Sequence, residues 1–407
     1  MRVLFLHQNF PAQFRHLAPR LATREGWDVR GLGVHEPVPP PLLGVTSYRY
    51  PIPDANPSPQ PRLREIDTKL RRADGVFRAI STLKEKGFTP DLVIGHPGWG
   101  EMLRLGEVLP EAKEISYAEI YYQDTGGDHD FDPEFPYPES NLPLRNRLAN
   151  AAIDVSMARC RAAVAPTAWQ AGRFPAHFQD KIHQIHDGID TRILKPRERG
   201  ILDLDGWTVA KGEKVVTFAT RYLEPMRGVH TFLRALPLIQ AMEPDCKTVV
   251  VGRDDKSYWR MEKDKPTHKK RLIAEVSDRL DWDRVRFVPW LQRDALTRLF
   301  QVSAAHVYLT FPFVLSWSML EAMACGAPVI GSRTDPVMEV IEDGVNGHLV
   351  DCLDPEDLAE RVVAVLRDPE GQKPIRARAR ETVVEKYDLE TVCLPQWLKV
   401  IDRVVAS

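Results

Sequence analysis

The segment KVVTFATRYLEPMRGVHTFLRALPLIQAMEPDCKTVVVG, residues 214–252, predicts a strand, a loop, a helix and a second strand. Residues 214–220 and 247–252 are short apolar runs of the kind that form buried strands, and 228–242 has the apolar spacing of an amphipathic helix. A helix that connects two such strands makes them parallel and covers one face of their sheet. This segment therefore predicts an α/β fold.

The same alternation continues on both sides of this segment. Helical patterns lie at 12–26, 62–86 and 317–325, whereas 37–61 contains nine prolines and is predicted to be irregular. Further buried strands are predicted at 2–6, 91–95, 113–119, 162–167, 285–288, 306–309, 327–331 and 348–350. The chain is thus expected to form two doubly wound parallel sheets with a ligand cleft between the carboxyl ends of their strands.

Length and composition narrow the class of protein. A chain of 407 residues exceeds one hydrophobic core, and the charged segment 189–212 is the predicted linker. The net charge of −2 predicts no general attraction to nucleic acid. Five scattered cysteines and the short apolar run at 3–6 favour a reduced, soluble, cytoplasmic protein without a signal peptide. The basic segment 62–86 is either a solvated helix face or a peripheral contact with an anionic membrane.

Two arginines border the loop between strand 214–220 and helix 228–242. Arg221 follows the strand, and Arg227 with Gly228 precedes the helix. Free N–H groups at a helix start favour anions, and guanidinium groups donate bidentate hydrogen bonds suited to a diphosphate. The alternative is that both are ordinary surface arginines.

A second loop, FPFVLSWSMLEAMACGAP at 311–328, joins a strand to a helix that Ser316 or Ser318 could cap. Glu321 would lie in the first turns of this helix. Its carboxylate could accept hydrogen bonds from a ribose diol, or it could simply complement the helix dipole.

These motifs resemble glycosyltransferase family 4. The resemblance rests on Arg221 with Arg227-Gly228, on Gly252, on VRFVPWL at 285–291, on SMLEAMACGAPVIGS at 318–332 and on EVIEDGVNGHLVD at 339–351. It implies the GT-B fold, retention of anomeric configuration and nucleotide-sugar donors. The closing segment 387–406 resembles the terminal helix that crosses back to the first domain. The implied domains are 1–192 with 388–407, on the acceptor side, and 193–387, on the donor side.

The resemblance also implies roles for individual residues. Arg221 and Arg227 match the clamp on the donor diphosphate, although the family usually has Arg then Lys, one residue closer. Glu321 matches the carboxylate that binds the ribose hydroxyls. The remaining donor-binding positions are Gly252, Val288 and Leu291 near the nucleobase, and Ser316, Trp317 and Ser318 near the sugar and β-phosphate.

The chain departs from the family pattern at two positions. Phe313 stands where the first Glu of the family's Glu-x7-Glu signature would contact the transferred sugar. Glu119 stands where many members have a histidine that faces the reacting carbon, and it is predicted to act as a base, to stabilise positive charge on the sugar, or merely to pair with an arginine. His96 matches an earlier histidine, which is either catalytic or caps the turn after its strand.

The acceptor side of the first domain is expected to include Asn9, Phe10 and Gln13, because the Asn9-Phe10-Pro11 turn replaces a Gly-Gly loop of the family. Asp-x-Asp triplets such as Asp130 and Asp132 lie in polar segments and do not predict a metal site. The long loop 125–141 is expected to shape the acceptor pocket.

The sequence therefore predicts a retaining, metal-independent glycosyltransferase of polysaccharide or related biosynthesis, without a cofactor. Its donor would be a UDP- or GDP-sugar, and its acceptor a saccharide, a lipid-linked saccharide or a small molecule. Two alternatives remain, namely a nucleotide-sugar epimerase on the same fold and an inactive nucleotide-sugar-binding protein.

Overall fold

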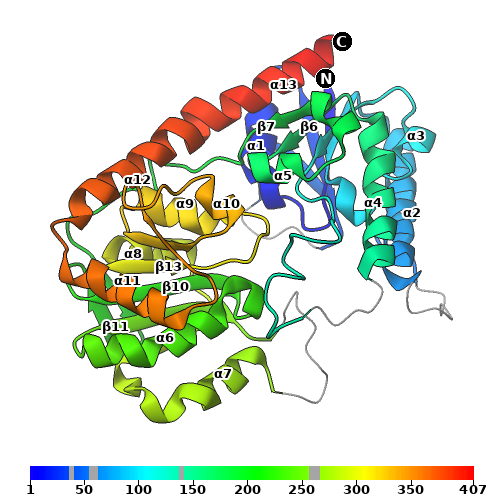
Figure 1. Cartoon of the computed structure of the whole chain (residues 1–407). Helices are drawn as coiled ribbons and strands as arrows, with labels where there is room; N and C mark the ends of the chain where they lie inside the picture. The colour runs from blue at the N-terminus through cyan, green and yellow to red at the C-terminus, as the bar shows by residue number, and fades with distance from the viewer. Residues whose placement is uncertain (36–40, 55–62, 137–141, 256–265) are drawn as a thin grey trace. The chain divides into compact units, whose positions relative to one another are not determined.

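The computed structural model describes residues 1–35, 41–54, 63–136, 142–255 and 266–407. The chain divides into two compact units. The first comprises Met1–Asp124, Ser140–Gly188 and Glu390–Ser407, and the second comprises Thr125–Glu139 and Ile189–Leu389. Each unit is built on one parallel sheet with helices packed against it (Figure 1). The predicted pair of α/β sheets is thus confirmed.

The sheet of the first unit has seven parallel strands in the order β3-β2-β1-β4-β5-β6-β7. Its strands are β1 Arg2–Leu6, β2 Asp28–Gly33, β3 Val45–Arg49, β4 Leu92–Gly95, β5 Lys113–Tyr117, β6 Ala162–Ala165 and β7 Ile182–Gln184. Its helices are α1 Leu17–Ala22, α2 Arg64–Glu85, α3 Leu105–Val108, α4 Leu142–Arg159, α5 Ala168–Gly172 and α13 Leu394–Ala406. Residues Val3 to Leu6 are fully buried, because helices cover both faces of a central parallel strand.

The second unit has six parallel strands in the order β12-β11-β10-β13-β14-β15. These strands are β10 Val215–Tyr222, β11 Lys247–Arg253, β12 Val285–Val288, β13 Ala305–Tyr308, β14 Val329–Ser332 and β15 His348–Val350. Its helices are α6 Val229–Met242, α7 His268–Val276, α8 Arg293–Val302, α9 Trp317–Ala324, α10 Asp335–Met338, α11 Pro355–Arg367 and α12 Gln372–Tyr387. Two apolar clusters fill the two sides of this sheet, one under α6 and α11 and the other under α8 and α9.

The segment predicted to be irregular and the predicted linker both contain strands. β3 lies inside the proline-rich segment 37–61, whose residues 36–40 and 55–62 are outside the described part of the chain. The antiparallel hairpin of β8 Ile201–Leu204 and β9 Trp207–Ala210 lies inside the predicted linker. Asp205 and Gly206 join its strands, both with positive φ, as a two-residue type I′ turn requires. The Asp-Gly pair was the sequence signal for this hairpin, which packs onto the second unit through Leu202 and Val209.

The chain ends with α13 on the first unit, as the resemblance implied. The ring of Trp397 stacks on Tyr117 with 6.5 Å between centroids. Lys113 donates its Nζ to the Val405 carbonyl at 2.7 Å. These contacts fix the last helix against β5, the strand that precedes Glu119.

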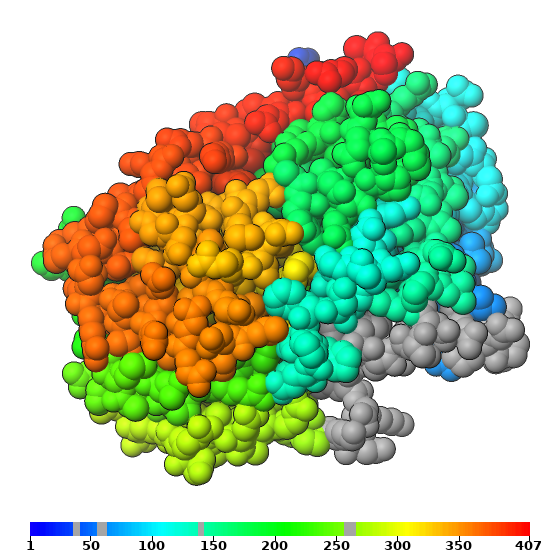
Figure 2. All heavy atoms as spheres, viewed as in Figure 1, coloured from blue at the N-terminus to red at the C-terminus, as the bar shows by residue number. Residues whose placement is uncertain are grey.

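The surface helices are polar on their outer sides. Figure 2 shows α12 and α13, in orange-red and red, on the molecular surface, where Lys373, Arg378 and Glu381 of α12 are exposed. The basic helix α2 turns one cation inward, because buried Lys69 donates to the Ala149 carbonyl at 3.1 Å. No described helix combines the length and the apolarity that a membrane span requires.

Candidate active site

The strand order of the second sheet reverses between β10 and β13, and such reversals are where open α/β sheets bind ligands. A hollow of about 230 Å³ opens at the carboxyl ends of these two strands. Its lining consists of Phe218, Ala219, Thr220, Arg227, Val307, Tyr308, Leu309, Ser316 and Ser318. This volume includes the space open to solvent at the mouth of the hollow.

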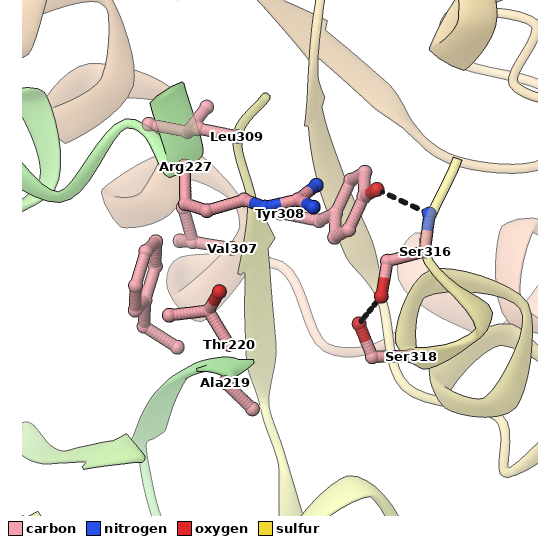
Figure 3. Close-up of a pocket in the computed structure, with 9 residues that line it drawn as sticks. Ala219, Thr220, Arg227, Val307, Tyr308, Leu309, Ser316 and Ser318 are labelled. Atoms are coloured by element: carbon pink, nitrogen blue, oxygen red, sulfur yellow. Dashed lines mark hydrogen bonds between the residues drawn. The ribbon is translucent and has the colours of Figure 1, made fainter. Parts of the chain in front are cut away.

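Arg227 is the cation of this hollow. It ends the short 3₁₀ turn Pro225–Arg227, and Gly228 follows with a φ of 65° at the start of α6. Its Nη1 donates to Thr310 Oγ1 at 3.3 Å, and Figure 3 shows the side chain extending towards Ser316. No carboxylate in the described part of the chain pairs with Arg227, so its charge is available to an anion.

Phe313 lies beside Arg227, with 5.5 Å between the guanidinium carbon and the ring centroid. This is a cation–π distance. A glutamate at this position could pair with the guanidinium and cancel its charge, whereas the aromatic ring supports the side chain and leaves the charge in place. The departure at Phe313 thus removes one carboxylate and preserves the cation.

The amino end of α9 forms the opposite wall. Ser316 is the N-cap residue, and its hydroxyl lies 3.1 Å from that of Ser318. The Ser316 backbone N–H donates to Tyr308 Oη at 2.9 Å, as the dashed line in Figure 3 shows. This N–H is therefore already hydrogen-bonded within the protein. The two hydroxyl groups on the positive end of the helix remain as polar groups facing Arg227.

Glu321 lies one turn further along α9 with its side chain only 5% exposed. Its Oε1 forms an ion pair with Nη1 of Arg293 at 2.7 Å. Arg293 is the first residue of α8, and its side chain is 47% exposed. The predicted ribose ligand is thus already paired through one of its two oxygens.

Two other predicted donor residues, Arg221 and Gly252, differ in their position relative to this hollow. Arg221 is exposed, is not part of the lining, and has its guanidinium carbon 5.5 Å from the Tyr222 ring centroid. Gly252 is buried beside Leu223 and the lining residue Thr220. A Cβ at position 252 would lie 2.8 Å from Leu223 Cδ2, so glycine permits the close approach of these strands.

Val288, Leu291 and Trp317 are partly buried and pack against one apolar cluster. They lie at the ends of β12 and α9 and in the loop after β12. Their predicted places near the nucleobase and the sugar remain predictions.

The first sheet reverses its strand order between β1 and β4. His96 follows β4, and its Nε2 lies 3.0 Å from Oε2 of Glu119, which follows β5. Gln13, at the start of the first helical turn, donates its Nε2 to the other Glu119 oxygen at 2.8 Å. The three residues predicted from separate segments therefore form one cluster at the carboxyl ends of the strands.

Hydrogen bonds indicate which nitrogen of His96 carries the proton and why Glu119 is ionised. His96 Nδ1 accepts the Gly98 N–H at 3.0 Å, which is the predicted capping of the turn, so the ring proton is on Nε2 and is donated to Glu119. Burial alone would raise the pKa of Glu119, but the hydrogen bonds from His96 and Gln13 lower it below its ordinary value. Glu119 is thus a carboxylate held through both oxygens, with a side chain 18% exposed.

His7 and the turn after β1 complete this cluster. Burial, together with the nearby His96, lowers the pKa of His7 to about 3, so its ring is neutral. His7 Nδ1 accepts the Asn9 N–H at 2.9 Å. The predicted acceptor residue Phe10 is 8% exposed and packs on Gly31, so its side chain belongs to the core.

The loop that was expected to shape the acceptor pocket packs against the second unit. Asp132 Oδ2 lies 3.2 Å from His230 Nε2 of α6, and both side chains are nearly fully buried. Phe131 packs on Phe311 with 5.0 Å between ring centroids. Glu134 pairs with Arg234 at 2.6 Å. These contacts place residues 131–135 beside the start of α6, next to Arg227 in sequence. The part of the loop at 137–141 lies outside the described residues.

The sequence reasoning missed three residues of the donor-side site, namely Tyr308, Thr310 and Arg293. Tyr308 ends a strand that was predicted, so its place at a carboxyl end was a usable signal. Thr310 is fixed by Ser332, whose Oγ accepts the Thr310 N–H at 3.1 Å and donates to its carbonyl at 3.0 Å. Arg293 stood in a polar segment without any distinguishing pattern.

Comparisons with known proteins identify the family of the chain. Residues 25–194 match the family model described as "Glycosyl transferase family 4 group", and residues 205–382 match "Glycosyl transferases group 1". The chain is 27% identical over 227 residues to spore coat protein SA of Bacillus subtilis, covering 54% of this chain and 58% of that one. It is 30% identical over 201 residues to phosphatidyl-myo-inositol mannosyltransferase of Mycobacterium leprae, covering 48% of each chain. The chain thus matches about half the length of these relatives.

Solved structures share the fold over the whole chain. HepE of Anabaena in complex with UDP has a TM-score of 0.69 at 16% identity, covering 99% of this chain and 100% of that one. Sucrose-phosphate synthase of Thermosynechococcus elongatus has a TM-score of 0.72 at 16% identity, covering 100% of both chains. With two family models that match successive segments and a fold shared from end to end, the chain belongs to glycosyltransferase family 4, group 1, and has the GT-B fold.

Proposed function

We propose that this protein is a retaining glycosyltransferase that moves a sugar from a UDP- or GDP-sugar to a hydroxyl of a saccharide, lipid-linked saccharide or small-molecule acceptor. The main support for this proposal is the environment of Arg227. This cation has no carboxylate partner among the described residues, and it faces two serine hydroxyls at the amino end of α9. This combination suits the diphosphate of a nucleotide sugar. The UDP bound to HepE supports the choice of donor, and the mannosyltransferase relative supports a lipid-linked acceptor.

On the donor side, cleavage of the sugar–phosphate bond leaves negative charge on the nucleoside diphosphate. Arg227 would stabilise this charge, and Thr310 and Phe313 hold the guanidinium in place before the reaction. One such preorganised donor is worth about 2.7–4 kcal/mol of transition-state free energy. Because the guanidinium supplies the positive charge, we propose that transfer needs no metal ion.

On the acceptor side, the lowered pKa of Glu119 distinguishes between a general base and a carboxylate that stabilises positive charge. A general base works best with a pKa near the working pH, and the pKa of Glu119 is lowered instead. A carboxylate that stays ionised is better suited to stabilise positive charge on the sugar ring. Of the roles considered for Glu119, electrostatic stabilisation is the one that the hydrogen bonds from His96 and Gln13 favour.

The test of the donor site is calorimetric titration with UDP, GDP, ADP and dTDP, each with Mg²⁺ and with EDTA. We expect one nucleotide to bind equally well in both. Arg227→Ala should weaken this binding by about 10- to 150-fold, because hydrogen bonds to charged groups contribute about 1.5–3 kcal/mol. The control is Arg298→Ala, an exposed arginine of α8. Unchanged affinity in Arg227→Ala would refute the proposed diphosphate site.

The test of the reaction is transfer from the matching nucleotide sugar to a panel of acceptors. Glu119→Gln keeps the shape of the side chain and removes its charge, and we expect it to slow transfer by about 10²–10³-fold without weakening nucleotide binding. An epimerase would convert the donor sugar without an acceptor. A protein that binds nucleotide and converts no donor with any acceptor would be an inactive binder.

A further inference from the structure

The ion pair between Arg293 and Glu321 is a feature that the diphosphate site does not use. Glu321 is almost fully buried, and in the described part of the chain the 2.7 Å pair with Arg293 is its one ion pair. Arg293 is half exposed at the first position of α8. A buried carboxylate thus faces a cation that solvent, or a ligand, can reach.

Two apolar residues, Leu291 and Trp317, are close to this pair along the chain. Leu291 is two residues before Arg293, and Trp317 is four residues before Glu321 on the same face of α9. Both apolar side chains pack against the same cluster of the second unit. A base packed against either of these side chains would bring its ribose close to the ion pair.

The ion pair also changes which hydrogen-bonding groups Glu321 and Arg293 present to a ribose. A carboxylate with two unpaired oxygens could accept a hydrogen bond from each hydroxyl of the diol. Here Oε1 is paired with Nη1 of Arg293, so Oε2 is the oxygen left for a ribose hydroxyl. A guanidinium carries five N–H donors, and most of those of Arg293 remain for a hydroxyl oxygen.

We propose that Arg293 and Glu321 form a composite ribose site. Glu321 Oε2 accepts a hydrogen bond from one ribose hydroxyl, and the guanidinium of Arg293 donates to the other. The proposal rests on the proposed nucleotide-sugar function. It adds a specificity-determining residue from α8 that the resemblance did not supply.

The test is to compare the nucleoside diphosphate that binds wild-type protein with its 2′-deoxy and 3′-deoxy forms. In the wild type each missing hydroxyl should weaken binding by about 10- to 150-fold, since each contact involves a charged group. In Arg293→Ala the loss for one deoxy form should fall to about onefold, while the loss for the other persists. Arg293→Lys keeps the charge without the planar fork and should give an intermediate loss. Arg298→Ala, on the same helix, should behave as the wild type.

Arg293→Ala leaves Glu321 buried without its partner, which could destabilise the fold. The double variant Arg293→Ala/Glu321→Gln removes this buried charge, and we expect it to bind both deoxy forms nearly as well as the parent nucleotide.

Equal losses for the deoxy forms in the wild type and in Arg293→Ala would overturn the composite site. Tighter binding of the parent nucleotide to Arg293→Ala would overturn it as well, because the arginine would then compete with the ribose. These results leave the proposed function standing if Arg227→Ala still weakens binding. Failure of the wild type to bind any of the four nucleotides would instead reject both proposals.

Discussion

The substitution Gly228→Ala should be strongly destabilising, because two separate penalties coincide at this position. Gly228 has a φ of 65°, a conformation that costs an L-residue about 1–2 kcal/mol. The new Cβ would lie 2.3 Å from Leu309 Cβ and 2.8 Å from Leu309 Cδ1. A Cβ cannot rotate away from its backbone, so the loop or β13 must shift, and overpacking of this kind costs about 1–3 kcal/mol.

The loss of a glycine also stiffens the unfolded chain, which offsets about 0.4–1 kcal/mol. The expected decrease in the free energy of unfolding is therefore about 1–5 kcal/mol. Gly344→Ala is the matched control, since Gly344 has a φ of 73° and a Cβ added there would meet no atom within 4 Å. It carries the backbone penalty without the steric one, so it should be milder by about 1–3 kcal/mol.

The assay is urea unfolding followed by tryptophan fluorescence, with nucleotide affinity measured on the same samples. Gly228→Ala should also weaken nucleotide binding, because Gly228 is the neighbour of Arg227 and the loop must move. Equal destabilisation by the two substitutions would refute the steric reasoning, since Leu309 distinguishes the two sites.

Two further predictions concern stability and the loop on the second unit. Burial lowers the pKa of His306 from 6.5 to about 3, so the stability that its neutral form provides is complete above pH 6.5 and is lost as the pH falls towards 3. His306→Asn keeps an acceptor for the Thr217 hydroxyl, which lies 2.8 Å from His306 Nδ1. Wild type should lose about 1.4 kcal/mol more than this variant for each pH unit below 6.5 in urea unfolding, and a constant difference between pH 7 and pH 5 would contradict the assignment. Phe135→Ala should destabilise the protein by about 3–5 kcal/mol, because the ring is 5% exposed and lies 4.9 Å from the His230 ring. Limited proteolysis should then cut residues 125–136 faster, whereas an unchanged cleavage rate would show that the ring does not anchor this loop.

The sequence predicted ten strands of the two parallel sheets and missed β2, β3 and β7, together with the β8–β9 hairpin. A central parallel strand is buried on both faces and therefore appears as a short apolar run, as at Val3–Leu6. β3 is the last strand of its sheet, is buried at only one of its five positions, and lies between prolines, so no apolar run marks it. The β8–β9 hairpin alternates buried and exposed residues within a charged segment, and only its Asp-Gly turn pointed to it.

For the candidate site, the order of residues along the chain was enough to show which loops carry polar and cationic groups, because these loops follow recognisable strands. Arg227 and Ser316 were found in this way, whereas His96 and Glu119 were implied by the resemblance to the family. What those groups touch depends on the folded chain. The crossovers place β13 beside β10, and this is why Tyr308 and Thr310 meet an arginine about 80 residues earlier in the chain.

The ionisation and pairing of the two carboxylates also depend on the folded chain. The sequence shows that Glu119 and Glu321 are carboxylates, but their state depends on partners from other segments of the chain. Gln13 and His96 hold Glu119 ionised, and Arg293 occupies one oxygen of Glu321. Hydrogen bonds and ion pairs act over a few ångströms, so distances along the chain do not determine them, and only the packed strands and helices do.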